Sequence, residues 1–333
     1  MTISIERVKA ILSEFAKQKI LVVGDLMLDR YIYGSVSRIS PEAPVPVVHV
    51  TGEKSMPGGA ANAAWNLTSL GSKAVVNGVL GRDHAGEELK AILAQSGVTV
   101  AGSLETGELP TIVKTRIIAE RQQVVRVDWE GTGELDETQM NAFCESLTQS
   151  VSGCTGVILE DYGKGMIQPP VVEAVLKAAA SAKVPVGFDP KDNHEFIVKG
   201  VTIATPNRKE AFTIAGVKEA PAQANPLEDK QLLKAVDILR GKWEPELLLV
   251  TLGSHGMLLA GADGTLKHVP TRAREVFDVS GAGDTVIATC VLALSAGATP
   301  YEAAELANYA AGVVVGKLGT ASCTQDELIR YME

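Results

Sequence analysis

The sequence predicts an α/β protein with a doubly wound, mostly parallel β-sheet flanked by helices on both faces, and with a small accessory β-sheet. Short apolar runs alternate with amphipathic runs along nearly all of the 333 residues, as expected when strands alternate with helices. The apolar runs lack polar alternation, which is typical of parallel strands that are buried on both faces. Two segments rich in β-branched residues interrupt this order, and they predict the accessory sheet.

Six apolar runs are predicted to be strands of the main sheet: KILVVGD (19–25), AVVNGVLG (74–81), TGVILED (155–161), VPVGFD (184–189), TIATPN (202–207) and ELLLVTLG (246–253). The runs between them predict helices: AANAAWNLTSLG, HAGEELKAILAQSG, PPVVEAVLKAAASA, RKEAFTIAG and DKQLLKAVDILRGK. An amphipathic helix is expected before the first strand, in MTISIERVKAILSEFAKQK. Ligands of such sheets bind at the carboxyl ends of the strands, so a site is expected along that edge.

The accessory sheet is expected from two excursions of the chain, VSRISPEAPVPVVHVTGEKS (36–55) and TIVKTRIIAERQQVVRVDWE (111–130), the second with a hairpin around 119–123. Strands outside the main sheet would leave open edges, so we expect the two excursions to pair with each other. No repeat or domain linker is visible, and residues 1–333 are expected to form one domain. Three arginines would leave some positions of this sheet polar: Arg116, Arg121 and Arg126.

Composition narrows the classes of function. The hydrophobic content of 46% and charged content of 21% are those of a globular protein with a sizeable core. A formal net charge of −9 argues against nucleic-acid partners and against binding to anionic membranes. The four cysteines form no C-x-x-C pair, and neither a signal peptide nor a membrane-spanning run is visible. We therefore expect a cytoplasmic protein.

Six polar loops follow predicted strands: GDLMLD, EDYGKG, DPK, PNRKE, TLGSHG and DVSGAGD. Together they suggest a site for a hydroxyl-rich, phosphorylated ligand. The last of them, DVSGAGDT (278–285), places glycines between two carboxylates just before a helical run. Free N–H groups at the start of a helix attract anions. The second carboxylate, Asp284, would compete with an anion there, which makes sense if it accepts a proton while a phosphoryl group arrives.

Two common nucleotide motifs are absent. A dinucleotide fingerprint needs G-x-G-x-x-G directly after the first strand, where this chain has GDLMLD. A Walker A loop, G-x-x-x-x-G-K-[ST], is not found either. The sequence therefore favours neither a Rossmann dehydrogenase nor a P-loop kinase.

Four motifs together resemble those of the ribokinase-like (PfkB-type) carbohydrate kinases. DVSGAGDT is similar to the C-terminal signature of that family, and PGGAANAAWNLTSLG (57–71) is similar to its N-terminal glycine motif. TPNRKE and TLGSHG match the intervening motifs in order and spacing, so the resemblance covers essentially the whole chain. It implies a ribokinase-like fold whose accessory sheet is a lid over the sugar. It also implies phosphorylation of a sugar hydroxyl by ATP with Mg²⁺.

Within this family, RISPEAPVPVV, PGGAAN, DYGKG, DPK and GAGDTVI resemble the kinase half of the bacterial heptose enzymes. That branch phosphorylates D-glycero-D-manno-heptose 7-phosphate at O1 during ADP-heptose synthesis for lipopolysaccharide. The chain ends just past the kinase segment, as expected of a stand-alone kinase or an isolated domain of a fused enzyme. One departure is the spacing of two residues between Gly59 and Asn62, where ribokinase has three. It fits the heptose branch and weakens the transfer of ribokinase sugar contacts.

The resemblance implies a role for each motif residue at the phosphoryl-transfer centre. Asp284 would be the general base, and the N–H groups of Gly281, Ala282 and Gly283 would stabilise the transferring phosphoryl group. The structural alternative for Asp284 is that it caps the helix. Two residues match the N-x-x-E motif that positions Mg²⁺ through water and the ATP phosphates, and they also fit a helix capping box: Asn207 and Glu210.

On the nucleotide side, the resemblance implies contacts with ATP from Thr251, Gly253, Gly256 and Asn308. The alternatives are a simple β-turn for the two glycines and a structural role for the asparagine. A monovalent-cation loop, suited to K⁺, would be formed by Asp278 and Ser280 with backbone carbonyl groups near Val314 and Gly319.

On the sugar side, five residues match positions that hold sugar hydroxyls: Asp29, Gly58, Gly59, Asn62 and Asp161. A carboxylate accepts two hydroxyl donors at once, which suits a polyol, and a helix cap is the alternative for the asparagine. The candidates for holding the phosphate of the sugar are Arg116, Lys164 and Lys191. Their alternative role is that of ordinary solvated surface cations.

The expected partners are a sugar phosphate, ATP and a second copy of the chain. A homodimer through the lid would cover the apolar faces of the accessory sheet. Two other functions remain possible on the residues alone. One is a kinase of the same fold that acts on a hexose phosphate, a pentose or a nucleoside. The other is a non-catalytic sugar sensor, against which the intact Asp284 and glycine turn argue.

Overall fold

The computed structural model describes residues 3–120, 122–131, 133, 135–192 and 196–333. Within these residues the main sheet has nine strands. From one edge to the other they are β15 (Leu266–Val269), β14 (Met257–Gly261), β13 (Leu247–Thr251), β12 (Ile203–Ala204), β11 (Val186–Asp189), β10 (Gly156–Glu160), β1 (Lys19–Gly24), β4 (Lys73–Asn77) and β6 (Val98–Val100). The strands from β13 to β6 are parallel, and β14 and β15 add an antiparallel edge. The predicted fold class is confirmed.

Helices cover both faces of the main sheet. One apolar cluster contains Ile20 and Val22 of β1, and it is shared with α1 (Ile5–Phe15), α2 (Ala60–Ser69), α3 (His84–Gln95), α8 (Ala282–Ser295), α9 (Pro300–Val315) and α10 (Gln325–Met332). The other cluster contains Leu21 and Val23, and it is shared with α4 (Glu137–Val151), α5 (Pro169–Ala182), α6 (Arg208–Ala215) and α7 (Lys230–Trp243). Because neighbouring residues of a strand point to opposite faces, β1 is apolar from Ile20 to Val23.

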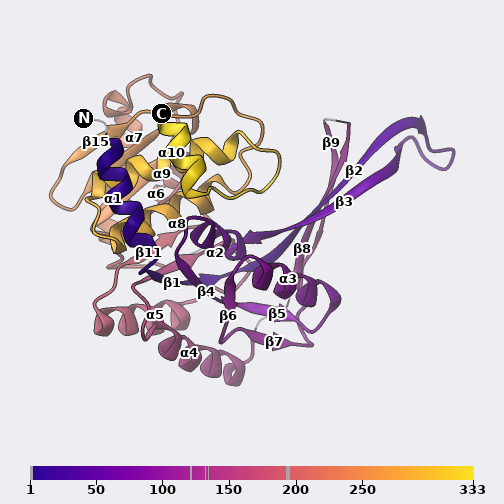
Figure 1. Cartoon of the computed structure of the whole chain (residues 1–333), viewed down its shortest axis with the longest axis horizontal. Coiled ribbons are helices and arrows are strands. Elements are labelled where there is room, and N and C mark those ends of the chain that lie inside the picture. Colours follow the sequence, from indigo (N-terminus) through magenta and orange to yellow (C-terminus); the bar gives the residue numbers. More distant parts are fainter. Residues whose placement is uncertain (1–2, 121, 132, 134, 193–195) are drawn as a thin grey trace.

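The accessory sheet has four strands in the order β3–β2–β8–β9: β2 (Leu26–Ile39), β3 (Pro46–Gly59), β8 (Ile112–Ala119) and β9 (Gln122–Trp129). Figure 1 shows these strands extending from the helical body as a long ribbon. The two excursions therefore do join one sheet, through the parallel pair β2–β8. The predicted hairpin is present, with Ala119 opposite Gln122. Arg121 lies outside the described residues.

The predicted boundary of the first excursion is wrong. It was expected to begin at residue 36, but β2 begins at Leu26 and pairs with the end of β3 at Gly59. Asp29 was expected in a loop and instead lies inside this strand. The carboxylates of GDLMLD suggested a loop. The segment is a strand because its backbone pairs with β3 and β8, which are distant in the sequence.

The predicted strand 74–81 is also divided. Its second part, β5 (Val79–Gly81), leaves the main sheet and pairs with β7 (Leu104–Thr106) in a separate two-stranded sheet. The division falls at Gly78, where a Cβ atom would stand 2.5 Å from the carbonyl oxygen of Gly24 and 2.6 Å from Cγ of Leu26. Glycine lets the chain pass this close to the start of β2. Among the described residues, no helix combines the length and apolar character needed to cross a membrane.

Candidate active site

The glycine turn before α8 forms one wall of the candidate site. Gly281 is the N-cap residue of the helix, with a left-handed φ of 76°, and a Cβ atom there would lie 2.5 Å from Nδ2 of Asn62. Glycine is therefore required by both conformation and space. Because Gly281 occupies the N-cap position, the alternative that Asp284 caps this helix is wrong. Asp284 lies three residues further on, in the first turn of α8.

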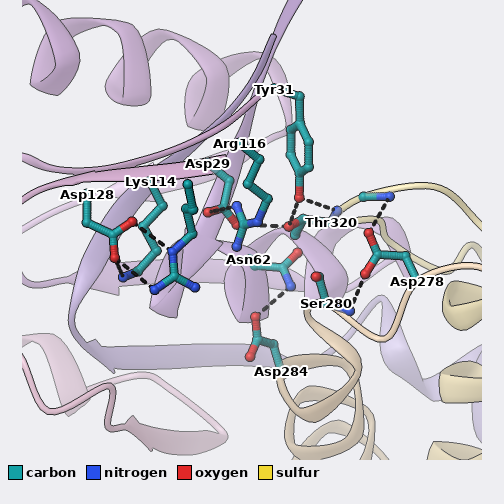
Figure 2. A network of polar contacts seen from close by, with 12 residues as sticks. Asp29, Tyr31, Asn62, Lys114, Arg116, Asp128, Asp278, Ser280, Asp284 and Thr320 are labelled. Atoms are coloured by element: carbon teal, nitrogen blue, oxygen red, sulfur yellow. Dashed lines mark hydrogen bonds and ion pairs between the residues drawn. The ribbon is translucent and has the colours of Figure 1, made fainter. Parts of the chain in front are cut away.

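Asp284 is buried and held by donors from two different elements. Nδ2 of Asn62 donates to its Oδ2 atom at 2.6 Å, and the hydroxyl of Tyr162 donates to its Oδ1 atom at 2.6 Å. The contact with Asn62 is visible in Figure 2. Burial raises the pKa of Asp284 to about 6, although both hydrogen bonds oppose this rise. A carboxylate whose pKa lies near neutrality is well suited to accept a proton.

The orientation of Asn62 is fixed by its neighbours. The N-cap position of α2 is Gly59, so the alternative that Asn62 caps this helix is wrong. Nδ2 of Asn66 donates to Oδ1 of Asn62 at 3.2 Å, and the hydroxyl of Thr285 donates to Oδ1 of Asn66 at 3.0 Å. These bonds leave Nδ2 of Asn62 directed at Asp284.

The loop after β10 carries Tyr162, a site residue that sequence reasoning missed although it lies within the DYGKG motif. Asp25 shapes this loop, because its carboxylate accepts the backbone N–H groups of Tyr162, Lys164 and Met166 at 2.9, 3.1 and 3.0 Å. Asp161 accepts the N–H group of Gly163 at 2.7 Å. Side-chain identity alone could not indicate that the phenol would reach Asp284, since this depends on the path of the loop.

Asp29, on β2, is near enough to Asp284 for its charge to raise the pKa of that carboxyl. Arg116 donates to the Oδ1 atom of Asp29 at 2.6 Å, and the hydroxyl of Thr320 donates to its Oδ2 atom at 2.8 Å. The hydroxyl of Tyr31 accepts the N–H group of Thr320 at 2.9 Å. A Cβ atom on Gly58 would stand 2.8 Å from Oδ2 of Asp29. This cluster therefore joins the accessory sheet to a C-terminal loop, and Thr320 had no local sequence signal.

The three cations predicted to hold a sugar phosphate are not brought together. Arg116 pairs with Asp29, Lys164 pairs with Glu130, and Nζ of Lys191 lies 2.9 Å from Oε1 of Glu210. Lys191 is therefore found beside the start of α6, with the residues expected near ATP.

Asn207 and Glu210 form the capping box that the sequence predicts at the start of α6. Oδ1 of Asn207 accepts the N–H group of Glu210 at 2.9 Å, and Oε2 of Glu210 accepts the N–H group of Asn207 at 3.0 Å. Among the described residues, no three His, Cys, Asp or Glu side chains gather as a ligand set for a metal ion. Residues of this kind fit a Mg²⁺ ion held mainly by water and phosphate oxygens, which is the usual arrangement for that ion.

Two further acids, the buried Glu160 and the half-buried Asp189, lie near the start of α8. Glu160 and Asp189 end the neighbouring strands β10 and β11 in register, and Thr205 donates to Oδ1 of Asp189 at 2.5 Å. Burial is the main cause that raises the pKa of both carboxyl groups well above their ordinary values. Oδ2 of Asp189 lies 3.8 Å from the position of a Cβ atom on Gly283. The sequence predicted both acids in polar loops at the expected site, EDYGKG and DPK, but indicated no role for either of them.

A cavity of about 300 Å³ opens beside the first turn of α8. Its lining includes the four residues predicted for the nucleotide: Thr251, Gly253, Gly256 and Asn308. Ala282 and Gly283 also line it, so the first turn of α8 reaches this cavity while Asp284 faces Asn62. Nδ2 of Asn308 donates to the carbonyl oxygen of Pro270 at 2.6 Å, which supports a structural role for that group.

The segment predicted as a cation loop lies against the end of α9. Asp278 accepts the N–H groups of Ser280 at 2.9 Å and Gly319 at 3.1 Å. A Cβ atom on Gly316 would meet the carbonyl oxygens of Val313 at 3.4 Å and Glu275 at 3.8 Å. Carbonyl and carboxylate oxygens at the negative end of a helix suit a cation.

Comparison with known proteins agrees with this geometry. A family model described as pfkB family carbohydrate kinase matches residues 17–327. Bifunctional protein HldE of Hahella chejuensis is 43% identical over 320 residues, which are 96% of this chain and 64% of that protein. Bifunctional protein HldE of Pseudomonas syringae pv. tomato is 44% identical over 325 residues, 98% of this chain and 66% of that protein. The chain thus spans somewhat less than two thirds of the length of these curated relatives.

Two solved structures show the same fold. Ribokinase of Arabidopsis thaliana, complexed with ribose and ATP, has a TM-score of 0.72 and 20% identity, with 95% of this chain and 99% of that chain covered. Phosphofructokinase-2 of Escherichia coli, in complex with potassium, has a TM-score of 0.75 and 19% identity, with 95% and 98% covered. At these identities the likeness concerns the fold alone.

Proposed function

The chain belongs to the pfkB family of carbohydrate kinases, and from this premise we propose that it uses ATP to phosphorylate D-glycero-D-manno-heptose 7-phosphate at O1. The observation that carries the proposal is the position of the first turn of α8. Its residues Ala282 and Gly283 line the cavity of about 300 Å³, and the next residue, Asp284, faces Asn62 on the opposite side. One helical turn would therefore contact both the nucleotide and the sugar.

Asp284 is the proposed general base. It would accept the proton of the sugar hydroxyl as that oxygen attacks the γ-phosphorus of ATP. The N–H groups of Gly281, Ala282 and Gly283, at the positive end of α8, would stabilise the charge on the phosphoryl oxygens. Phosphoryl transfer depends mainly on positioning and charge stabilisation, so these groups account for the chemistry required of the chain.

The sugar would lie between the glycine turn and the accessory sheet. We assign its hydroxyl contacts to Asp29, Asn62, Asp161 and the backbone at Gly58 and Gly59. Asp29 and Asp161 are buried, and each oxygen of a carboxylate can accept more than one hydrogen bond. The heptose substrate is supported by the motifs RISPEAPVPVV and DYGKG, which resemble those of the bacterial heptose kinases, and the relatives named HldE are consistent with that branch.

The nucleotide would occupy the cavity beside α8. Its apolar lining suits an adenine ring, with Thr251, Gly253, Gly256 and Asn308 around it. Asn207 and Glu210 would hold Mg²⁺ through water, and the metal would neutralise charge on the ATP phosphates. Lys191, which pairs with Glu210, is better placed for those phosphates than for the sugar. The oxygens near Asp278, Ser280 and Gly316 would suit K⁺.

We further propose that the chain forms a homodimer through the accessory sheet and acts in the cytoplasm, where ATP is available. The support for the dimer is the face of this sheet that points away from Asp29. Val125, Val127 and Trp129 alternate along β9 on that face and are exposed. A second copy would bury such a face against its own equivalent, the commonest form of closed symmetry.

The proposed function is tested by measuring ADP release with a panel of acceptors. The panel contains D-glycero-D-manno-heptose 7-phosphate, free heptose, fructose 6-phosphate, ribose and a nucleoside. The heptose phosphate is expected to give the highest kcat/KM. If another phosphorylated sugar gives a higher kcat/KM, the chain is still a kinase but its substrate is not the heptose phosphate. If no sugar gives ADP release, the result argues for a non-catalytic sugar sensor.

A further inference from the structure

We propose that the polar face of the accessory sheet carries a subsite for the phosphate group already present on the sugar, formed by Lys114 and Arg126 together with Arg116. This inference rests on the proposed function and adds to it the location of the anion and two residues. Its basis is the arrangement of cations on one face of the sheet.

Strand register places these cations on the same face. Across the antiparallel pair β8–β9, Lys114 lies opposite Asp128, and Arg116 lies opposite Arg126. Residues two apart on a strand share a face, so all four side chains lie on one side. The intervening pairs, such as Val113 with Trp129, occupy the other side. The sheet is thus polar on one face and largely apolar on the other in this region.

The polar face is directed toward the candidate active site. Arg116 bonds to Asp29, which bonds to Thr320 beside the glycine turn. Figure 2 shows the side chains of Asp128, Lys114, Arg116 and Asp29 near one another on neighbouring strands of the accessory sheet, in the view that also contains Asp284. A ligand contacting Asp29 would therefore have the cations next to it.

Two of the cations in this group share one carboxylate. Arg126 donates to both oxygens of Asp128, at 2.8 and 3.0 Å, and Nζ of Lys114 approaches the same carboxylate at 3.3 Å. Arg116 is attracted by Asp29 and Asp278, and it stands directly opposite Arg126, a like-charge pair that destabilises a sheet. A phosphate dianion bound between the two arginines would offset this repulsion.

The burial of these side chains separates them from ordinary surface cations. The side chains of Lys114 and Arg116 are only 11% and 14% exposed, so water screens their charge poorly. The side chain of Arg126 is 50% exposed and can turn toward a ligand, while Asp128 remains paired with Lys114. By contrast, Lys164 pairs with Glu130, and Lys191 is attracted by three carboxylates, Glu210, Asp192 and Asp189. Arginine also suits a phosphate because its guanidinium group donates two parallel hydrogen bonds.

The test compares Arg126→Met with Arg330→Met, a matched loss of one exposed arginine on α10, away from the accessory sheet. For each protein, kcat and KM are measured with phosphorylated and unphosphorylated forms of the same sugar, and a thermal melt verifies folding. Arg126→Met is expected to lower kcat/KM for the phosphorylated sugar about 10- to 100-fold, mainly through KM, as for the loss of a charge-assisted hydrogen bond. For Arg126→Met with the unphosphorylated sugar, and for Arg330→Met with either sugar, kcat/KM should change less than about twofold.

The possible outcomes separate the subsite from the proposed function. If the preferred sugar phosphate is not a heptose but Arg126→Met still loses the preference for the phosphorylated sugar, the phosphate subsite is supported and only the heptose substrate is wrong. If the wild-type protein prefers sugar phosphates and Arg126→Met affects both forms equally or neither, the subsite is wrong and the kinase stands. If no sugar is phosphorylated, titration with inorganic phosphate followed by NMR of the arginine side chains decides. Shifts of Arg116 and Arg126 support the subsite, and their absence overturns it.

Discussion

Asp284 depends on its partners for both position and pKa. Asn62 comes from α2 and Tyr162 from the loop after β10, so the carboxylate of this C-terminal helix is held by two separate segments of the N-terminal half of the chain. Both donors lower a pKa that burial raises, and the balance lies at about 6. These contacts explain why a residue in the first turn of a helix can serve as a base instead of as a cap.

The Asp284→Asn variant is expected to fold and to bind ATP but to lose most of its turnover. An amide cannot accept the proton of the sugar hydroxyl, and a positioned general base contributes about 10²- to 10⁴-fold in rate. Turnover is measured as ADP release at saturating substrates, with ATP binding measured separately. Retention of more than about a tenth of the wild-type turnover is incompatible with Asp284 as the base.

Removal of the Tyr162 hydroxyl should shift the pH profile. Its hydrogen bond to Asp284 lowers the pKa of that carboxyl, so Tyr162→Phe leaves burial less opposed and raises the pKa above about 6. Since a general base must be ionised to accept a proton, the acidic limb of kcat/KM should move to higher pH if Asp284 has the proposed role. Tyr301→Phe, a change on α9, serves as the control. An unchanged acidic limb in Tyr162→Phe would mean that the phenol does not act on the base.

At the level of elements, the accessory sheet is connected to the glycine turn through Thr320, which hydrogen-bonds to Asp29 and lies beside Gly281. β2 follows directly from Asp25, and Asp29 within it reaches Thr320, which follows α9. Lid closure would therefore be expected to involve both the sheet and the C-terminal loop. It would also exclude water from the phosphoryl group and limit hydrolysis of ATP.

Sugar binding should protect the accessory sheet from hydrogen exchange. Amides in both excursions, 36–55 and 111–130, are expected to exchange more slowly when the sugar phosphate is bound, because a closed lid loses solvent access and mobility. Exchange measured by mass spectrometry with ATP alone provides the control. If neither segment gains protection with sugar, this sheet is not a lid.

At the level of the whole molecule, the face of the accessory sheet that points away from the site predicts association. The side chain of Trp129 is 65% exposed there, beside Val127 and Val125, an unusual position for a large aromatic residue in an isolated subunit. A two-fold pair of such faces would bury it without creating a new open edge.

Light scattering at micromolar protein concentration is therefore expected to give the mass of a dimer. Trp129→Glu should give a monomer, because a charge would then be buried in the interface. Leu227→Glu, at an exposed leucine elsewhere, should remain dimeric. A monomeric mass for the wild-type protein would refute the dimer, and a dimeric mass for Trp129→Glu would move the interface to another surface.

Local patterns in the sequence were sufficient for six strands of the main sheet and for several helices, whereas β6, β14 and β15 were not predicted. The helix PPVVEAVLKAAASA is found as α5, and the strands at 19–25 and 155–161 are found within one residue or two. Their buried faces follow from the periodicity of apolar residues, a pattern formed by residues that are close together in the sequence. The path of GDLMLD was not predictable in this way, because β2 is defined by pairing with β3 and β8.

The sequence by itself determined the fold class, the position of the glycine turn and the position of Asp284 at the start of the following helix. Each of these depends on residue types at short spacing. Tertiary structure alone decided which distant groups meet there: Tyr162 and Asn62 on the base, Thr320 on Asp29, and Arg126 opposite Arg116. It also paired Lys164 and Lys191 with separate carboxylates, so that they do not join Arg116. Hydrogen bonds and charge pairs act over a few ångströms in space, and separation along the chain does not predict that distance.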